Sequence, residues 1–146
     1  MGHIEGEIVI DRPVDTVFDF VADERNEPLY NPEISHAELV TEEPIGEGTR
    51  FVAFTSTMGR PLEMVIEFTG YERPKRLSST TVMSTADTRG TLTFEPDMAG
   101  TRMHWSWEVR PKGLMKLLAP VLIPLGRRQE RTVWANLKRH LEGRPS

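Results

Sequence analysis

The feature that most constrains this chain is a change of hydrophobic period after Pro111-Lys112-Gly113. Before that point, short segments alternate apolar and polar residues, which is typical of half-buried β-strands. After it, residues 114–141 repeat their apolar positions with a helical period. A helix that follows a series of hairpins can bury its apolar stripe on the concave face of their antiparallel sheet. We therefore expect a sheet that wraps around a C-terminal helix, with room for a small apolar molecule between them.

Composition indicates one domain and excludes several functional classes. A chain of 146 residues suits a single domain spanning residues 1–146. It contains no cysteine, so we expect neither disulfides nor thiolate chemistry. The net charge is −4 and no basic block dominates, which argues against nucleic-acid binding. The first residues lack an apolar signal-peptide stretch, and we expect a cytoplasmic protein, either a monomer or a homodimer.

The N-terminal third predicts a strand and two short helices. Residues Ile4 to Asp11 place three isoleucines on one parity, as a strand with one buried face does. Pro13 suits a first helical turn, and we expect Asp11 to act as its N-cap. A second short helical segment is predicted between Asp23 and Tyr30, before Pro32.

Six further strands are predicted, separated by turns at residues 44–48, 59–61, 74 and 97–100. They span Ile34–Thr41, Thr49–Met58, Leu62–Tyr71, Leu77–Ser84, Thr88–Glu95 and Thr101–Val109. The last of them alternates most clearly. Its pattern assigns Trp105 and Trp107 to the covered face and His104 to solvent. The register of Arg89 stays open, with an exposed arginine favoured.

The C-terminal segment predicts an amphipathic helix that begins irregularly. Pro120 and Pro124 predict a kink, or a short helix joined to a longer one. The stripe that we expect to face the sheet comprises Met115, Leu118, Leu122, Leu125, Gln129, Val133, Leu137 and Leu141. Residues 114–125 are too short to span a bilayer. A membrane contact or a gate at the cavity mouth is an alternative for them, and packing on the sheet is favoured.

Sequence patterns for catalysis and metal binding are weak. The one Glu-x-x-His spacing, Glu33 to His36, falls where a loop enters a strand, so no metal or cofactor is expected. Glu63 and Glu67 lie on the same face of a predicted strand, and the alternation makes it the solvent-exposed face. A serine nucleophile elbow is missing, and no catalytic residue is assigned.

Several motifs together resemble the SRPBCC or START-like superfamily, specifically its polyketide cyclase/dehydrase branch. They are residues 12–19 (RPVDTVFD), 30–32 (YNP), 46–51 (GEGTRF), 72–77 (ERPKRL) and 136–142 (NLKRHLE). The family pattern often has tryptophan where Tyr30 stands. The resemblance implies an α+β helix-grip fold: a seven-stranded curved antiparallel sheet around a long C-terminal helix, with two short helices after the first strand. It also implies a largely apolar cavity, and known members bind lipids, sterols, quinones or polyketides.

The candidate ligand-binding residues are those expected on the covered strand parities and on the helix stripe. They are Tyr30, Phe51, Met64, Ile66, Phe68, Trp105, Trp107, Leu118, Leu122, Leu125, Gln129 and Val133. Gln129 is notable because an amide in an apolar stripe needs a hydrogen-bond partner if it is buried. For the tryptophans, core packing is favoured over a ligand wall.

Three functions remain open on the sequence. A noncatalytic carrier of a small hydrophobic ligand, lipid-like, polyketide or aromatic, is favoured, with no stable membrane insertion. A polyketide cyclase or dehydratase is the rival, and Tyr30 is then the best proton-transfer group, with His36 or Arg89 possible if the register differs. A protein-interaction module, using the outer sheet face or the basic side of the helix, is the third.

Overall fold

Seven strands form one antiparallel sheet in the order β1-β7-β6-β5-β4-β3-β2. The computed structural model describes residues 2–57, 60–98 and 100–143. The strands are β1 (Gly2–Ile10), β2 (Ile34–Leu39), β3 (Arg50–Thr57), β4 (Arg60–Glu72), β5 (Arg76–Met83), β6 (Ala86–Asp97) and β7 (Gly100–Pro111). The helices are α1 (Val14–Val21), the 3₁₀-helices η1 (Glu24–Leu29) and η2 (Gly113–Lys116), and α2 (Ala119–Leu141). The predicted helix-grip fold is confirmed.

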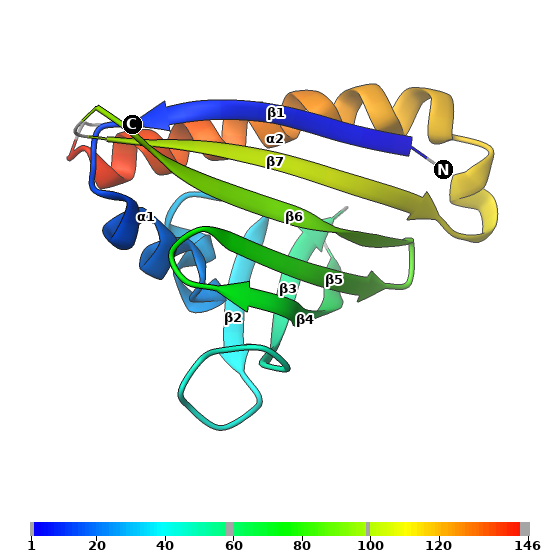
Figure 1. Cartoon of the computed structure of the whole chain (residues 1–146). Helices are drawn as coiled ribbons and strands as arrows, with labels where there is room; N and C mark the ends of the chain where they lie inside the picture. Colours follow the sequence, from blue (N-terminus) through cyan, green and yellow to red (C-terminus); the bar gives the residue numbers. More distant parts are fainter. Residues whose placement is uncertain (1, 58–59, 99, 144–146) are drawn as a thin grey trace.

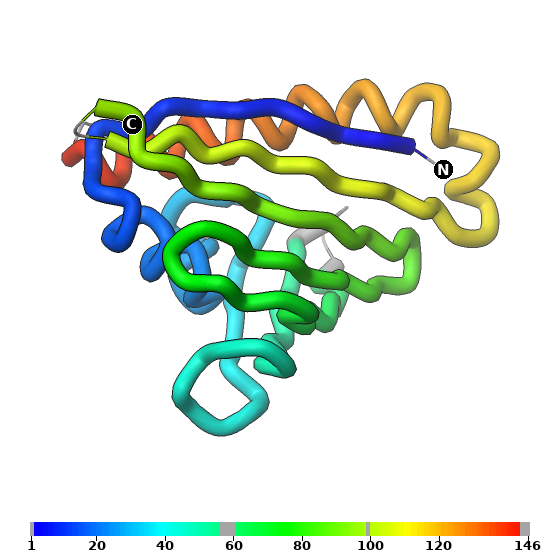
Figure 2. Tube along the Cα trace, in the orientation of Figure 1, coloured from blue at the N-terminus to red at the C-terminus, as the bar shows by residue number. Residues whose placement is uncertain are grey.

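The sheet curves, and α2 lies along β1 on its concave side (Figure 1). Strands β2 to β7 are neighbours in chain order, whereas β1 pairs with β7. The segment with α1 and η1 therefore connects the two opposite edges of the sheet, and it closes one end of the concave side (Figure 2).

Strand register places the tryptophans of β7 on the concave face, as predicted. Leu92 pairs with Trp105, and Gly90 pairs with Trp107, across the β6–β7 ladder. His104 lies on the opposite, convex face, where its Nε2 is 2.9 Å from Oε2 of Glu5. Because side chains alternate along a strand, this register fixes the face of every residue in both strands.

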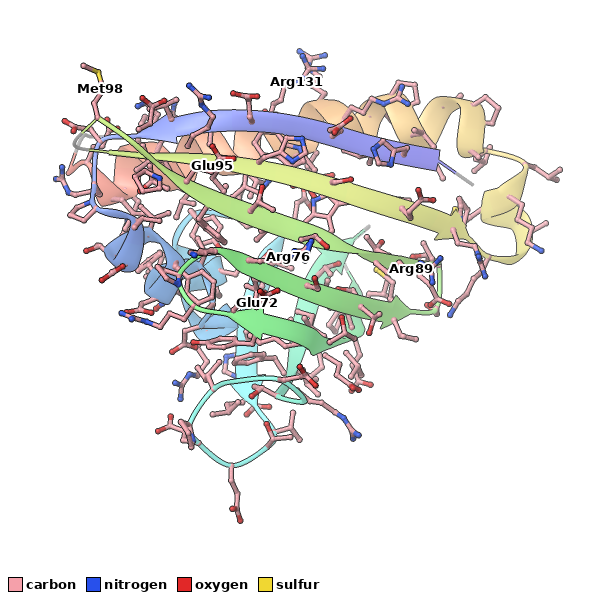
Figure 3. The ribbon with its side chains drawn as sticks, in the orientation of Figure 1. Glu72, Arg76, Arg89, Glu95, Met98 and Arg131 are labelled. Carbon is pink, nitrogen blue, oxygen red and sulfur yellow. The ribbon has the colours of Figure 1, made fainter. Side chains whose placement is uncertain are left out.

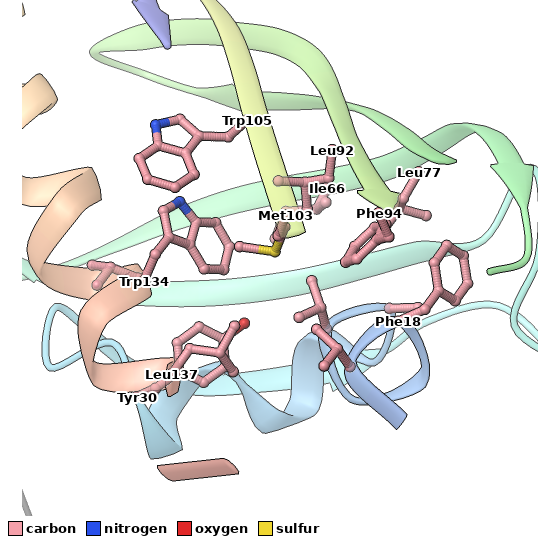
Figure 4. Close-up of a cluster of buried hydrophobic side chains, with 14 of the residues drawn as sticks. Phe18, Tyr30, Ile66, Leu77, Leu92, Phe94, Met103, Trp105, Trp134 and Leu137 are labelled. Atoms are coloured by element: carbon pink, nitrogen blue, oxygen red, sulfur yellow. The ribbon is translucent and has the colours of Figure 1, made fainter. Parts of the chain in front are cut away.

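The core fills the end of the concave side that α1 and η1 close (Figure 4). Val17, Phe18 and Val21 form the buried face of α1. The Phe18 ring packs edge-on against Phe94 and Tyr71, at centroid distances of 5.1 and 5.3 Å. Such edge-to-face pairs add to the free energy gained by burial alone.

The predicted cap of the first helix is wrong. The N-cap position of α1 is Pro13, which makes no side-chain cap, because the chain turns two residues after Asp11. The backbone N–H of Asp11 instead donates to Oε2 of Glu142, at 2.8 Å. The end of β1 is thereby joined to the end of α2.

The C-terminal segment is a short helix followed by a longer one, one of the two predicted forms. Pro120 lies in the first turn of α2, where its missing N–H costs no hydrogen bond, and Pro124 lies inside the helix. Of the predicted turn at residues 59–61, Gly59 lies outside the described residues, and Arg60 and Pro61 belong to β4.

The predicted buried stripe of α2 is wrong in its N-terminal half. The buried residues of α2 are Val133, Trp134 and Leu137, whereas Leu118 and Leu125 are 48% and 55% exposed. Gly126 faces the sheet instead, and a Cβ added to it would lie 3.0 Å from Cδ1 of Ile4. Compared with the prediction, α2 is rotated about its axis. The face that carries Gly126 and Trp134 packs against the sheet more closely than the face that carries Leu118 and Leu125 could.

Two glycines make room for the two tryptophans of the concave face. A Cβ on Gly6 would lie 2.4 Å from the Trp105 ring, and one on Gly90 would lie 1.9 Å from the backbone oxygen of Ser106 and 2.6 Å from the Trp107 ring. Neither position has space for a methyl group.

We predict that Gly90→Ala destabilises the fold by at least about 2 kcal/mol, because the strand backbone has to move to accept the methyl group. Urea unfolding followed by circular dichroism measures the change. Gly46→Ala is the control, since a Cβ there meets nothing within 4 Å. Equal stability of the two variants would contradict the close packing described here.

Candidate functional site

The concave face of the sheet divides into a packed end and an uncovered end. At the packed end Phe51, Phe68 and Phe94 are fully buried. Toward the other end of the same strands, side chains on the same face are only half-buried. They are Leu62, Met64, Thr81, Met83, Thr88, Trp107 and Val109. Solvent therefore reaches an apolar surface that a folded core would normally cover.

Cross-strand pairs hold this uncovered surface together. Met64 pairs with Met83 across β4 and β5, and Thr88 pairs with Val109 across β6 and β7. Trp107 adds a polar atom, because its indole Nε1 is buried and has no hydrogen-bond partner among the described residues. An orphan donor next to a solvent-accessible apolar wall suits a ligand with an oxygen acceptor.

The N-terminal half of α2 covers the edge of the sheet rather than its centre. Ile123 lies over Gly2, and Gly126 lies next to Ile4, both on β1. The C-terminal half reaches further in, where Trp134 packs 6.1 Å from Trp105 of β7 and 5.9 Å from Tyr30, measured between ring centroids. On the concave face of β4 and β5, Met64, Thr81 and Met83 accordingly remain half-buried.

The predicted ligand-binding residues fall into three groups. Tyr30, Phe51, Ile66, Phe68, Trp105 and Val133 are buried, Met64, Trp107 and Leu122 are half-buried, and Leu118, Leu125 and Gln129 are exposed. The half-buried Met64 and Trp107 lie on the uncovered surface. The binding role of the whole set stays a prediction.

A cluster of carboxylates lies between η1 and α2, and sequence analysis missed it. Burial, followed by the negative charge of Glu27, raises the pKa of Glu130 to about 8. Burial also raises the pKa of Glu24 well above its usual range, and the charge of Glu27 and a hydrogen bond between the two carboxyl groups add to this shift. Within the described part of the chain, these three glutamates form no ion pair with Lys, Arg or His.

Tyr30 and Trp134 complete the cluster. Tyr30 is only 4% exposed, and burial raises the pKa of its hydroxyl well above the usual range, assisted by the charges of Glu27 and Glu24. The indole of Trp134 lies close enough to Glu130 to lower the pKa of that carboxyl slightly, although its Nε1 makes no hydrogen bond of ordinary geometry with any described residue. Trp134 is therefore a neighbour of Glu130 rather than a hydrogen-bonded partner.

Near neutral pH this arrangement holds Glu130 as a neutral acid. A neutral carboxylic acid donates a hydrogen bond and gives or accepts a proton. Among the described residues no group of three or more His, Cys, Asp or Glu side chains is placed to hold a metal ion. The chemistry that the cluster offers is therefore hydrogen bonding and proton transfer.

The signal for the cluster was present in residue spacing. Glu130 is four residues before Trp134 and seven before Leu137, which places it on the buried face of the helix. Glu24 and Glu27 are three apart, and a 3₁₀-helix aligns such residues on one side. Because Arg128 and Arg131 stand close to Glu130 in the sequence, the local pattern is that of a solvent-exposed segment of the helix.

The convex face holds a separate, polar depression of about 310 Å³ on β5, β6 and β7. The outward-facing Thr80, Val82, Asp87, Arg89, Glu108 and Arg110 line it, together with Thr81 and Thr88, whose side chains the strand register assigns to the concave face. Arg89 is exposed there, on the outer side of β6 (Figure 3). This position excludes Arg89 from the concave site, and His36 is likewise exposed on β2.

Comparison with known families finds one match over nearly the whole chain. A family model described as polyketide cyclase / dehydrase and lipid transport matches residues 1–142. A comparison with curated protein sequences finds no match.

Solved structures share the fold at low sequence identity. The structure of TTHA0849 from Thermus thermophilus is 18% identical, with a TM-score of 0.79, and the match covers 97% of this chain and 98% of that one. The structure of Ara h 8.0201 is 16% identical with a TM-score of 0.76, at 97% and 98% coverage. A START superfamily protein from Mycobacterium smegmatis is 15% identical with a TM-score of 0.71, at 97% and 94% coverage.

We predict that Glu130→Gln removes a pH-dependent loss of stability. Between its ordinary pKa of 4.5 and its folded value of about 8, Glu130 binds a proton in the native state but not in the unfolded state. Stability therefore falls as the pH rises through this window. The variant should be more stable than wild type by up to about 5 kcal/mol near pH 9 and about equal near pH 4.

Urea unfolding at several pH values measures this difference. Glu95→Gln is the control, because Glu95 is exposed on the convex face (Figure 3). A stability difference for Glu130→Gln that does not change with pH would contradict the raised pKa.

Proposed function

The chain belongs to the polyketide cyclase / dehydrase and lipid transport family, and from that premise we propose that it binds a small hydrophobic molecule against the uncovered concave surface. The observation that carries this proposal is the half-burial of Met64, Trp107 and Val109 on a face whose other end is fully packed. A ligand that covers this surface gains about 25 cal/mol for each Å² of apolar area removed from water.

Polar groups at the two ends of the surface favour a ligand that carries oxygen acceptors. Trp107 supplies an N–H at the open end that is unpartnered among the described residues. We further propose that Glu130, a neutral acid in the cluster with Tyr30, supplies a second donor to the ligand. A few donors around an apolar wall orient a ligand while its apolar contacts supply most of the affinity. This pattern supports ketone, quinone or fatty-acyl compounds over pure hydrocarbons.

We predict that Thr81→Phe blocks ligand binding. Thr81 is half-buried on the concave face and pairs with Thr88, so an aromatic ring there fills the space that the ligand needs. Titration with the neutral apolar dye N-phenyl-1-naphthylamine, read by dye emission and by tryptophan fluorescence, should show affinity weaker by at least about tenfold. Native mass spectrometry of wild type should show a co-purified apolar molecule that the variant lacks.

Val82→Phe is the matched control, because Val82 is the next residue of β5 and lies on the convex face. It should bind the dye as wild type does. If Val82→Phe weakens binding and Thr81→Phe does not, the dye occupies the convex depression and the proposed site is wrong.

A second candidate function is acid–base catalysis on the bound ligand, of the cyclase or dehydratase type. The observation that favours it is the pair of Glu130, with its pKa of about 8, and the buried Tyr30 hydroxyl. In a dehydration, an acid protonates the departing hydroxyl group while a base takes the proton from the adjacent carbon, and water leaves. Glu130 suits the first role because it holds a proton near neutral pH.

We predict that any turnover of a β-hydroxy ketone analogue falls by at least about a hundredfold in Glu130→Gln, while the affinity for the dye stays unchanged. The wild-type rate should also decline as the pH rises above about 8, where Glu130 loses its proton. Absorbance of the conjugated product measures the rate. A wild-type protein that binds such analogues without converting them is a carrier.

A further inference from the structure

A row of apolar side chains at the start of the C-terminal helical region faces solvent. Leu114 and Leu117 are 80% and 78% exposed, and Val121 is 61% exposed. With Leu118 and Leu125 they form what we call the leucine patch. It lies at the end of the molecule remote from α1, where β7 turns into α2 (Figure 1).

Helical geometry places the patch opposite the sheet. Leu118, Val121 and Leu125 follow one another at intervals of three and four residues, so they share one face of α2. Trp134, on the buried face, is turned by about half a revolution from that face. The fold itself gains nothing from leucines there, and an exposed apolar cluster on a folded protein usually marks a contact surface.

The patch lies within the one strongly basic part of the chain. Residues 110–139 contain eight Lys or Arg and a single acidic residue, Glu130, while the remainder contains ten Lys or Arg and twenty-one acidic residues. The net charge of −4 therefore conceals a positive C-terminal segment, residues 110–139, and a negative body formed by the remainder. Such an asymmetry orients a protein in front of a charged surface.

Some of these cations are also free of carboxylate partners. Elsewhere Arg25, Arg73 and Arg102 each form an ion pair. Within residues 2–57, 60–98 and 100–143, by contrast, Lys116 and Arg128 make no ion pair with a carboxylate. They remain available for an external anion.

An open groove beside the leucine patch presents several cations of this region together. It has a volume of about 680 Å³ and is lined by Pro124, Arg128, Arg131, Thr132, Ala135 and Arg139 on one face of α2. Arg131 projects from this helix away from the sheet (Figure 3). Arginine binds phosphate groups through its planar set of donors.

Charge distinguishes between the two partners that could cover the leucine patch, a second copy of the chain and a lipid bilayer. A second copy of the chain, packed patch to patch about a two-fold axis, would bring two sets of unpaired cations together. An anionic bilayer supplies acyl chains for the leucines and phosphate groups for the cations at the same time. No helix in the described residues is long and apolar enough to cross a membrane, so the contact is with the surface.

We propose that the leucine patch docks onto the surface of an anionic lipid bilayer, with the leucines in the interfacial layer and Lys116, Arg128 and Arg131 at the phosphate groups. The docking goes beyond the proposed ligand binding and does not rest on it. In this orientation the N-terminal end of α2, which borders the uncovered concave surface, faces the bilayer.

Co-sedimentation of the full chain with vesicles tests the proposal. We expect binding to phosphatidylcholine vesicles that contain about one third phosphatidylserine, binding that weakens as salt is added, and little binding to phosphatidylcholine alone. Lys116→Gln should lower the partition coefficient about fivefold, and Leu117→Ser about tenfold.

Matched variants separate docking from general effects of charge and exposure. Lys75→Gln removes an exposed cation outside the basic part, and Val40→Ser removes an apolar residue that is 59% exposed on the negative body. Both should bind vesicles as wild type does, and circular dichroism should show all four variants folded.

Three results would overturn the proposal. The first is equal binding to both vesicle types, and the second is an equal loss of binding in the control variants. The third is absence of vesicle binding together with a dimer in sedimentation equilibrium that Leu117→Ser dissociates, which would assign the patch to a second copy. Since the vesicles contain no other ligand, failure here leaves the dye-binding result of the concave surface unaffected.

Discussion

The packing of Trp134 against Trp105 determines how the rest of the molecule is arranged. It fixes α2 to the sheet near the helix's C-terminal end, where Leu137 is fully buried and Nζ of Lys138 donates to the backbone oxygen of Val9 at 2.7 Å. The N-terminal half of α2 lies against the edge strand β1, where Arg127 donates to the backbone oxygen of His3 and Gly126 approaches Ile4. Figure 4 shows this attachment, whereas the leucines at the start of α2 lie on the opposite side of the helix and face solvent.

Burial gives the carboxylate cluster a character that suits an apolar site. Three ionised glutamates beside Tyr30 and Trp134 would keep water in the site and repel an apolar molecule. Burial, followed by the charge of Glu27, raises the pKa values of both Glu130 and Glu24, and Glu130, with a pKa of about 8, keeps its proton near neutral pH and can donate a hydrogen bond. In the proposed function the fold combines an apolar binding surface with a proton-transfer group, in keeping with a family described by both cyclase / dehydrase activity and lipid transport.

Strand positions could be predicted from the sequence because alternation along a strand has a period of two and leaves one choice of face. Trp105, Trp107 and His104 were assigned correctly for this reason. The face of α2 could not be predicted, because leucines lie on several sides of the helix and the close approach at Gly126 depends on Ile4, more than a hundred residues earlier. The raised pKa of Glu130 likewise depends on its burial and then on the charge of Glu27 of η1, and only the folded chain creates both.

The pairing of β1 with β7 has a consequence for synthesis. The β7 residues that pair with β1 lie about a hundred residues further along the chain, so the edge of β1 stays unpaired until β7 has been made. Contacts between segments so distant in sequence form slowly, because a long loop must close before they contribute. Until β7 is available, β1 therefore exposes an unpaired strand edge for longer than a strand in a local hairpin does. Unpaired edges promote aggregation, so the yield of folded protein depends on the rate of translation and on chaperones.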